Sequence, residues 1–222
     1  MSRKIYELGP DAAAWYSTIL DATVSALPSS IDDARALVEP IAGEVWMGSL
    51  ALYGGTTAGR AVHSSRRVSD RTRAEVFRRD GFICTYCGGR AIPRCILVAI
   101  SDVFPDEVPY YAHYRRGTVH PAYWALAPEA DHVLAHAKGG SSDAANLTTL
   151  HAMCNTQKSS LDSGALPVVE RPVHDDRWDG LLSRYADIVV AGETYGRRHA
   201  GPDYHPAWLR RFGRQTDDRL IG

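Results

Sequence analysis

Two groups of residues in this 222-residue chain have the types and spacing needed for chemistry. The first is made of Cys84-x-x-Cys87 and His151-x-x-Cys154. Cysteine and histidine pairs at this spacing are typical of tetrahedral zinc sites. His151 and Cys154 stand at i and i+3, so both face one side if their segment is helical. The spacing therefore predicts a structural zinc that ties a knuckle at Cys84 and Cys87, followed by Gly88-Gly89, to a later helix.

Two other interpretations of the cysteines stay open at this point. In one, His151 binds phosphate or packs in the core, and Cys95 is the fourth ligand. In the other, all four cysteines are free core thiols. A redox role for Cys84 and Cys87 is disfavoured, because the βαβ pattern expected around a redox Cys-x-x-Cys motif is missing.

The second group centres on Asp131 and His132, inside a stretch that reads as a strand over 129–134. Histidine has an unperturbed pKa of about 6.5, so His132 is a candidate general base near neutral pH. Hard divalent ions prefer oxygen ligands, and Asp131 and Asn155 each offer one. Adjacent strand residues point to opposite faces, so Asp131 and His132 would share an ion only at a bent or distorted strand end.

The ordered set of motifs resembles the HNH endonucleases of the ββα-metal nuclease superfamily over about residues 67–160. The elements that carry the resemblance are Arg78-Arg79-Asp80-Gly81, Cys84/Cys87, Asp131-His132, Gly139-Gly140, Asn146-Leu147, Cys154-Asn155 and Lys158. The departures are a long insertion at 91–128 and His151 where cysteine is common.

The resemblance implies a catalytic set made of His132, Asp131, Asn146 and Asn155. His132 would be the base, and Asp131 and Asn155 would hold one Mg²⁺ or similar ion at the scissile phosphate and the leaving 3′ oxygen. Asn146 would fix the hairpin loop and the orientation of His132. An ordinary turn asparagine is the alternative for Asn146. His136 is either a loop histidine or an auxiliary ligand or phosphate contact.

Charge is unevenly distributed along a chain whose net charge is −1. Residues 60–100 hold nine arginines and three acids, whereas residues 1–59 hold seven acids and three basic residues. A local basic surface on a near-neutral protein suits phosphate binding. We expect nucleic-acid contacts from Arg71, Arg73, Arg78, Arg79 and Lys158. The alternatives are a general abundance of arginine and, for Lys158, a solvated helix face.

The expected fold class is α+β: an HNH module with a zinc knuckle over 67–164, flanked by helical extensions at 1–66 and 165–222. The N-terminal region would serve packing, dimerisation or DNA positioning. Helices are expected over 10–27, from Ser30 to Val38, over 71–79 and over 151–160, and strands over 96–100, 129–134 and 147–150. Asp175-Asp176 would cap a further helix containing Trp178, Leu181, Leu182, Tyr185 and Ile188, and a last helix would run from Pro206 to Phe212 with arginines exposed.

The insertion at 91–128 is interpreted as a surface addition rich in aromatic residues. These aromatics would either stack on extruded bases or form a small core. They are Phe104, Tyr110, Tyr111, Tyr114, Tyr123 and Trp124.

The expected activity is metal-dependent hydrolysis of DNA, of the kind used in restriction or phage defence, with modification-dependent cleavage included. One active site cuts one strand, so a double-strand break needs a homodimer or two visits. No run of about 20 apolar residues or signal segment is present, which indicates a cytoplasmic protein without a membrane partner. The alternatives are a zinc-stabilised nucleic-acid-binding module that does not cut, and an RNA-cutting nuclease.

Overall fold

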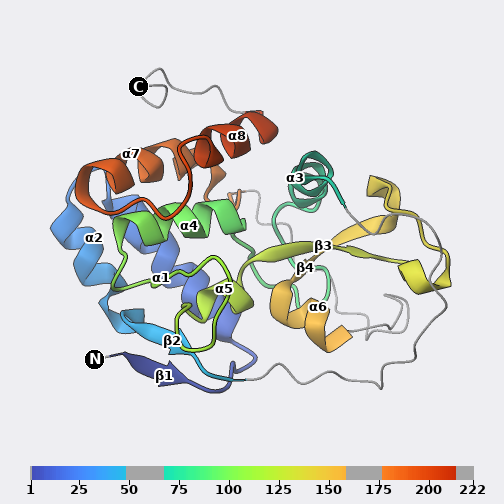
Figure 1. Ribbon diagram of the computed structural model, residues 1–222, viewed down its shortest axis with the longest axis horizontal. Helices are drawn as coiled ribbons and strands as arrows, with labels where there is room; N and C mark the ends of the chain where they lie inside the picture. The colour runs from blue at the N-terminus through green and yellow to red at the C-terminus, as the bar shows by residue number, and fades with distance from the viewer. Residues whose placement is uncertain (1, 49–67, 159–176, 214–222) are drawn as a thin grey trace.

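The computed structural model describes residues 2–48, 68–158 and 177–213 (Figure 1). The N-terminal part contains β1 (Arg3–Ile5), α1 (Ala12–Ala26), α2 (Ile31–Val38), η1 (Glu39–Ile41) and β2 (Glu44–Trp46). The middle contains α3 (Asp70–Arg79), α4 (Arg94–Val103), α5 (Ala122–Ala125), β3 (Pro128–His132), η2 (His136–Lys138), η3 (Ala144–Asn146), β4 (Leu147–His151) and α6 (Ala152–Lys158). The last part contains η5 (Leu182–Arg184), α7 (Tyr185–Tyr195) and α8 (Tyr204–Arg211).

The β3–β4 hairpin followed by α6 confirms the expected ββα arrangement. β3 and β4 are antiparallel, with Asp131 opposite Thr148 and His132 opposite Leu147. Helix α6 begins one residue after β4 ends, so it packs back against the hairpin. In Figure 1 this module lies to one side of a lobe formed by α1, α2, α4, α5, α7 and α8, and α3 stands between the lobe and the hairpin. The α+β fold class is therefore confirmed.

The segment 91–128 is central to the core, so its interpretation as a surface insertion was wrong. The predicted strand at 96–100 is also wrong, because these residues belong to helix α4, whose residues Cys95 to Val103 are all buried. Residues 96–100 form one uninterrupted apolar run, and so short a run does not separate a buried helix from a strand. Helix α4 packs most extensively against α7, far along the chain.

The aromatic residues of this segment mostly pack against one another. Tyr110 stacks on Tyr123 with ring centroids 5.0 Å apart, and Tyr114 meets Tyr123 and Trp124 edge-on. Tyr123 is fully buried and its hydroxyl pairs with Ser101 Oγ at 2.8 Å. The small-core interpretation describes them, except that Tyr111 is exposed.

Buried residues of both terminal regions belong to this core, and they come from the helices α1, α2, α7 and α8. The predicted helix that starts at Ser30 is α2, and Ser30 caps it by accepting a hydrogen bond from the Asp33 amide at 3.1 Å. The C-terminal prediction was only partly correct, because Trp178, Leu181 and Leu182 precede α7 in turns and a short 3₁₀ helix. The predicted capping pair Asp175-Asp176 lies outside the described residues. Within those residues, no helix has the length and apolar character needed to span a membrane.

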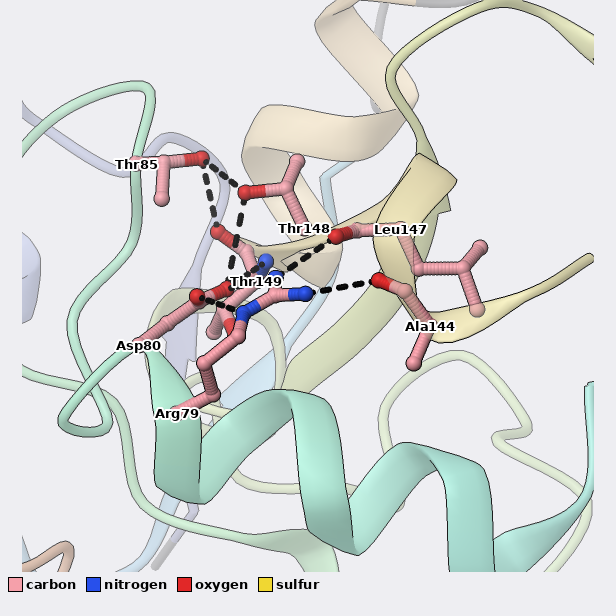
Figure 2. A network of polar contacts seen from close by, with 7 residues as sticks. All are labelled: Arg79, Asp80, Thr85, Ala144, Leu147, Thr148 and Thr149. Carbon is pink, nitrogen blue, oxygen red and sulfur yellow. Dashed lines mark hydrogen bonds and ion pairs between the residues drawn. The ribbon is translucent and has the colours of Figure 1, made fainter.

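Helix α3 holds the hairpin through the side chains of Arg79 and Asp80 (Figure 2). Arg79 donates to the carbonyl oxygens of Ala144 at 2.6 Å and Leu147 at 2.7 Å, and its Nε donates to Asp80 at 2.8 Å. Asp80 in turn accepts from the Thr149 amide at 2.9 Å. Ser69 starts the helix as predicted, by accepting from the Thr72 amide. The C-terminal end of α3 is thereby attached to β4 and to the turn before it.

Candidate active site and zinc cluster

The four predicted zinc ligands lie together. The ligand atoms of Cys84, Cys87, His151 and Cys154 are all within 4.8 Å of one another. His151 Nδ1 is 3.4 Å from Cys87 Sγ and 4.0 Å from Cys154 Sγ. Four ligands at about 2.3 Å from a tetrahedral ion are about 3.8 Å apart, so these separations suit zinc. The cluster joins the loop after α3 to the junction of β4 and α6, and it is compatible with a structural zinc.

Backbone hydrogen bonds around the cluster orient the His151 ring and favour negative charge on two of the sulfurs. His151 Nε2 faces the Arg90 carbonyl oxygen at 3.1 Å, which can only accept, so Nε2 carries the proton and Nδ1 is free for a metal. The His151 amide donates to Cys84 Sγ at 3.4 Å, and the Gly89 amide donates to Cys87 Sγ at 3.4 Å. These donors stabilise negative charge on sulfur, as metal-bound thiolates require.

The titration behaviour of the cluster also indicates a need for positive charge. Hydrogen bonds from Cys154 and Cys87 lower the pKa of Cys84, while the same pairing raises the pKa of Cys154. Burial lowers the pKa of His151, but hydrogen bonds with the Cys84 and Cys87 sulfurs outweigh it and raise that pKa to about 10. Three sulfurs this close cannot all ionise without a cation, and a bound zinc would supply that charge.

Cys95 is not part of the cluster, so the alternative with Cys95 as fourth ligand is wrong. It is buried in α4, where loss of solvent raises the pKa of its thiol to about 12. The interpretation of all four cysteines as free core thiols fits Cys95, whereas Cys84, Cys87 and Cys154 lie together with His151 and Cys87 is exposed.

A polar layer between β3 and α6 contains Asp131 and Asn155, two of the predicted catalytic residues. Lys158 donates to the Asp131 carboxylate and to the His132 carbonyl oxygen at 2.8 Å. Asn155 Nδ2 donates to Glu129 Oε2. Glu129 and Asp131 stand two residues apart on β3, so they share the face that meets α6. The structure brings Asp131 and Asn155 to one layer, each with a different partner.

Glu129 is a residue whose role was missed at the sequence level. An ionised carboxylate only accepts hydrogen bonds, so the Asn155 amide must turn its NH₂ group toward Glu129 and its oxygen away. The i, i+2 spacing of Glu129 and Asp131 in a strand was the available signal. Lys158 is only 2% exposed, so the alternative of a solvated helix face is wrong for it.

His132 leaves the opposite face of β3. Its Nε2 lies 3.2 Å from Ser142 Oγ, and its ring meets the buried His136 edge-on at 5.6 Å. His132 is half-buried among polar groups rather than packed in the apolar core. The β3–β4 ladder runs through His132 and one hydrogen bond further, from the Val133 amide to the Asn146 carbonyl oxygen at 2.8 Å. The bend expected at Asp131 and His132 is therefore absent from the ladder.

Asn146 fixes the loop that carries Ser142. Its Oδ1 accepts from the Leu134 amide at 2.9 Å, and its Nδ2 donates to the carbonyl oxygens of Leu134 and Ser141 at 3.1 and 2.8 Å. Gly140 is required beneath this amide, because a Cβ there would lie 1.9 Å from the Leu134 carbonyl oxygen. These contacts match the loop role expected of Asn146. They also connect Asn146, through Ser141, to the neighbouring Ser142, which contacts His132.

The four arginines of α3 expected to contact nucleic acid do not lie in equivalent surroundings. Arg79 is committed to the hairpin, as described above. Arg73 is half-buried and donates weakly to the Val68 carbonyl oxygen at 3.4 Å. Arg71 and Arg78 are exposed on the side toward α8. Both of these arginines line a groove there, whereas Arg73 lines a different pocket and Arg79, although exposed, is hydrogen-bonded to the hairpin.

A hairpin followed by a helix, with an Asp-His-Asn set beside a Cys₃His cluster, is consistent with the ββα-metal class of nuclease domains. In agreement, residues 125–161, which include β3, β4 and α6, match the HNH endonuclease family model. No curated protein and no solved structure matches the chain.

Proposed function

We propose that this protein is a metal-dependent endonuclease that hydrolyses phosphodiester bonds of duplex DNA. The observation that supports it best is the intact set of His132, Asp131, Asn146 and Asn155 within the segment that matches the HNH family. Each of these side chains sits on the ββα module, and each has a hydrogen-bond partner that restricts its orientation. The Cys84, Cys87, His151 and Cys154 cluster would hold a structural zinc that keeps α6 against the hairpin.

In the proposed mechanism His132 is the general base. A ring nitrogen of His132 would take a proton from the attacking water, while Ser142 orients the ring. Asn146 keeps Ser142 in place through the Ser141 carbonyl oxygen. The substrate phosphate would lie across the end of β3, where the face of Asp131 and the face of His132 meet.

Asp131 and Asn155 would hold the catalytic Mg²⁺ or similar ion. Their oxygens are the ligand type that such ions prefer, and Glu129 turns the Asn155 oxygen outward. When bound, the ion supplies charge neutralisation at the phosphate and at the leaving oxygen. Lys158 neutralises Asp131 from the protein side, and it stays a proposed phosphate contact together with Arg71, Arg73, Arg78 and Arg79.

DNA is the proposed polymer because the arginine-rich helix α3 adjoins the hairpin and presents a basic surface. The same proposal includes a role in restriction or phage defence, with cleavage that depends on base modification. It also includes a homodimer that cuts both strands. Cysteine ligands that stay reduced suit a cytoplasmic setting.

The test is a cleavage assay on purified protein. Duplex DNA, single-stranded DNA and RNA are incubated with Mg²⁺ or with Ca²⁺, and the DNA is supplied unmodified, methylated and hydroxymethylated. We expect Mg²⁺-dependent cutting of duplex DNA. His132→Ala is expected to cut about 10²–10⁴-fold more slowly, as loss of a general base predicts, while it still binds DNA.

The matched control is His113→Ala, which removes an exposed histidine from the loop after α4. It should cut at the wild-type rate. Cutting of RNA alone would favour the RNA nuclease instead. DNA binding with no cutting of any polymer would favour the binding module, and full activity of His132→Ala would exclude the proposed mechanism.

A further inference from the structure

A groove lined by arginines lies between α3 and α8, outside the hairpin site. It has a volume of about 460 Å³. Arg71 and Arg78 line it from α3, and Arg210 and Arg211 line it from α8. The remaining lining residues are Ala207 and Gly213. Two elements more than 120 residues apart in sequence therefore place four guanidinium groups around one concave surface.

The four arginines are only partly neutralised by the protein. Arg211 pairs with Asp70 at 3.3 Å and stacks over the Trp208 ring at 5.1 Å. Arg78 donates to the Phe212 carbonyl oxygen at 3.3 Å. Within the described residues, the side chains of Arg71 and Arg210 have no hydrogen bond or ion pair. One carboxylate among four exposed guanidinium groups leaves a net positive groove.

Helix stabilisation explains some of these charges but not all of them. Arg78, Arg210 and Arg211 lie in the last turns of their helices, where a cation interacts favourably with the helix dipole. Arg71 lies in the first turn of α3, where a cation is unfavourable. An exposed arginine at that end, facing three others, is better explained by an anion that binds between the helices.

The groove is also placed to meet the substrate of the neighbouring site. Helix α3 contacts both α8 and the β3–β4 hairpin, and Figure 1 shows it between them. A helix with its side chains is about 10 Å across, and successive phosphates of one strand advance about 3.4 Å along a duplex. A nucleic acid held at the hairpin would therefore reach the groove with phosphates a few nucleotides from the cut.

We propose that this groove binds the phosphate backbone of the DNA substrate beside the cleaved bond, so that α8 belongs to the DNA-binding surface. The choice of DNA as the polyanion rests on the proposed nuclease function. The α8 arginines lie far outside the segment that matches the HNH family, so the C-terminal region contributes a part of the interface that the domain itself lacks.

The test measures binding rather than cutting. Affinity for a labelled DNA duplex is followed by fluorescence anisotropy over a range of salt concentrations, in the His132→Ala background with Mg²⁺ present. In that background, Arg71→Gln/Arg210→Gln removes the two unpaired groove arginines. Each lost phosphate contact lowers the slope of log K against log salt by about 1, so the double variant should lower it by about 2. Arg71→Lys/Arg210→Lys should keep the wild-type slope.

The matched control is Arg115→Gln/Arg197→Gln, which makes the same charge change at two exposed arginines outside the groove. It should leave the slope unchanged. An unchanged slope in the groove variant, or an equal fall in the control, would overturn the proposal. Circular dichroism melting of each variant shows whether a loss of binding comes from unfolding, and unfolding of the groove variant would assign these arginines a structural role instead.

The two proposals fail in different ways. If wild-type protein cuts DNA and the groove variant binds and cuts like it, the groove proposal fails and the nuclease stands. If no polymer is cut but the groove variant still loses DNA affinity selectively, the nuclease proposal fails and the groove stands.

Discussion

At the residue scale, the candidate site is built from pairs on the two faces of one strand. Asp131 and Glu129 face α6, where they meet Lys158 and Asn155, whereas His132 faces the loop and meets Ser142. This arrangement separates the proposed general base from the proposed ion ligands by the thickness of one strand. It also means that the partners of the motif residues, rather than the motif residues alone, determine their orientation.

Glu129 provides the clearest test at this scale. Glu129→Gln replaces an acceptor-only group by one that also donates, so the Asn155 amide is free to turn over and withdraw its oxygen. Loss of such an outer partner typically costs about 10–100-fold in metal affinity or activity. We expect a Mg²⁺ titration of the cleavage rate to shift to higher concentration by that factor. The exposed Glu193→Gln should not shift it, and an unshifted curve for Glu129→Gln would refute the assigned role.

At the element scale, two attachments hold the hairpin and α6 in place. The Arg79–Asp80 pair joins the end of α3 to β4 and to η3, and the Cys₃His cluster joins the knuckle to α6. Neither hairpin nor α6 contributes much to the large apolar core; Leu150, Met153, Cys154 and Cys84 form a separate small cluster. The module therefore depends on polar contacts and on the Cys₃His cluster more than on apolar burial.

The Arg79 link can be tested by local stability. Arg79→Ala leaves the Ala144 and Leu147 carbonyl oxygens without this donor, which costs about 1–3 kcal/mol. We expect faster hydrogen–deuterium exchange of hairpin amides over 133–149. Arg71→Ala on the same helix removes an exposed arginine that makes no contact with the hairpin, so its exchange pattern should match the wild type. Equal exchange in the two variants would show that Arg79 does not hold the hairpin.

A structural zinc at the Cys₃His cluster predicts one zinc ion per chain. Elemental analysis of the purified chain should find one zinc per molecule. Cys84→Ser should lose this zinc and melt at a much lower temperature, because the binding of structural zinc contributes on the order of 10 kcal/mol to folding. Cys95→Ser should keep its zinc, because Cys95 lies in α4 away from the cluster. Zinc retained by Cys84→Ser but lost from Cys95→Ser would contradict the ligand assignment.

At the scale of the whole molecule, a buried polar network attaches the C-terminal helices to α4. Asp102 accepts from His199 through both its amide and ring nitrogen at 2.8 Å, and from His205 Nε2 at 3.1 Å. His205 Nδ1 in turn pairs with Tyr185 Oη at 2.8 Å. The network fixes the loop between α7 and α8, and hence the position of the arginines that line the groove.

This network predicts a pH-dependent contribution to stability. Burial raises the pKa of Asp102, but hydrogen bonds from His199 and His205 outweigh it and hold that pKa below its ordinary value. A folded pKa below the unfolded one, about 3.9, gives stabilisation that is present above that pH and is lost as pH falls through the folded pKa. At pH 7, Asp102→Asn should lower the free energy of unfolding by about 3 kcal/mol and the melting temperature by roughly 6–12 °C.

Thermal melts of wild type and Asp102→Asn between pH 3 and 8 provide the measurement. The difference in stability between the two proteins should narrow as the pH falls below about 4, because the unfolded carboxylate takes up a proton there while the folded one, with its lower pKa, is still ionised. The exposed Asp203→Asn, at the start of α8, should melt like the wild type at every pH. A gap that stays constant down to pH 3 would show that charge on Asp102 is not what stabilises the network.

The sequence by itself determined the module: ligand pairs at zinc spacing, the Asp-His-Asn motif and the strand–loop–strand–helix pattern all follow from local order along the chain. Local order was insufficient for α4, because the apolar run at 96–100 is too short to separate a buried helix from a strand, and its main partner α7 lies far away in sequence. Only the tertiary structure decided which polar group meets which. Distances between elements, which spacing along one chain does not specify, pair Glu129 with Asn155 and place Arg79 against the hairpin. They also place Arg71 and Arg210 on one groove.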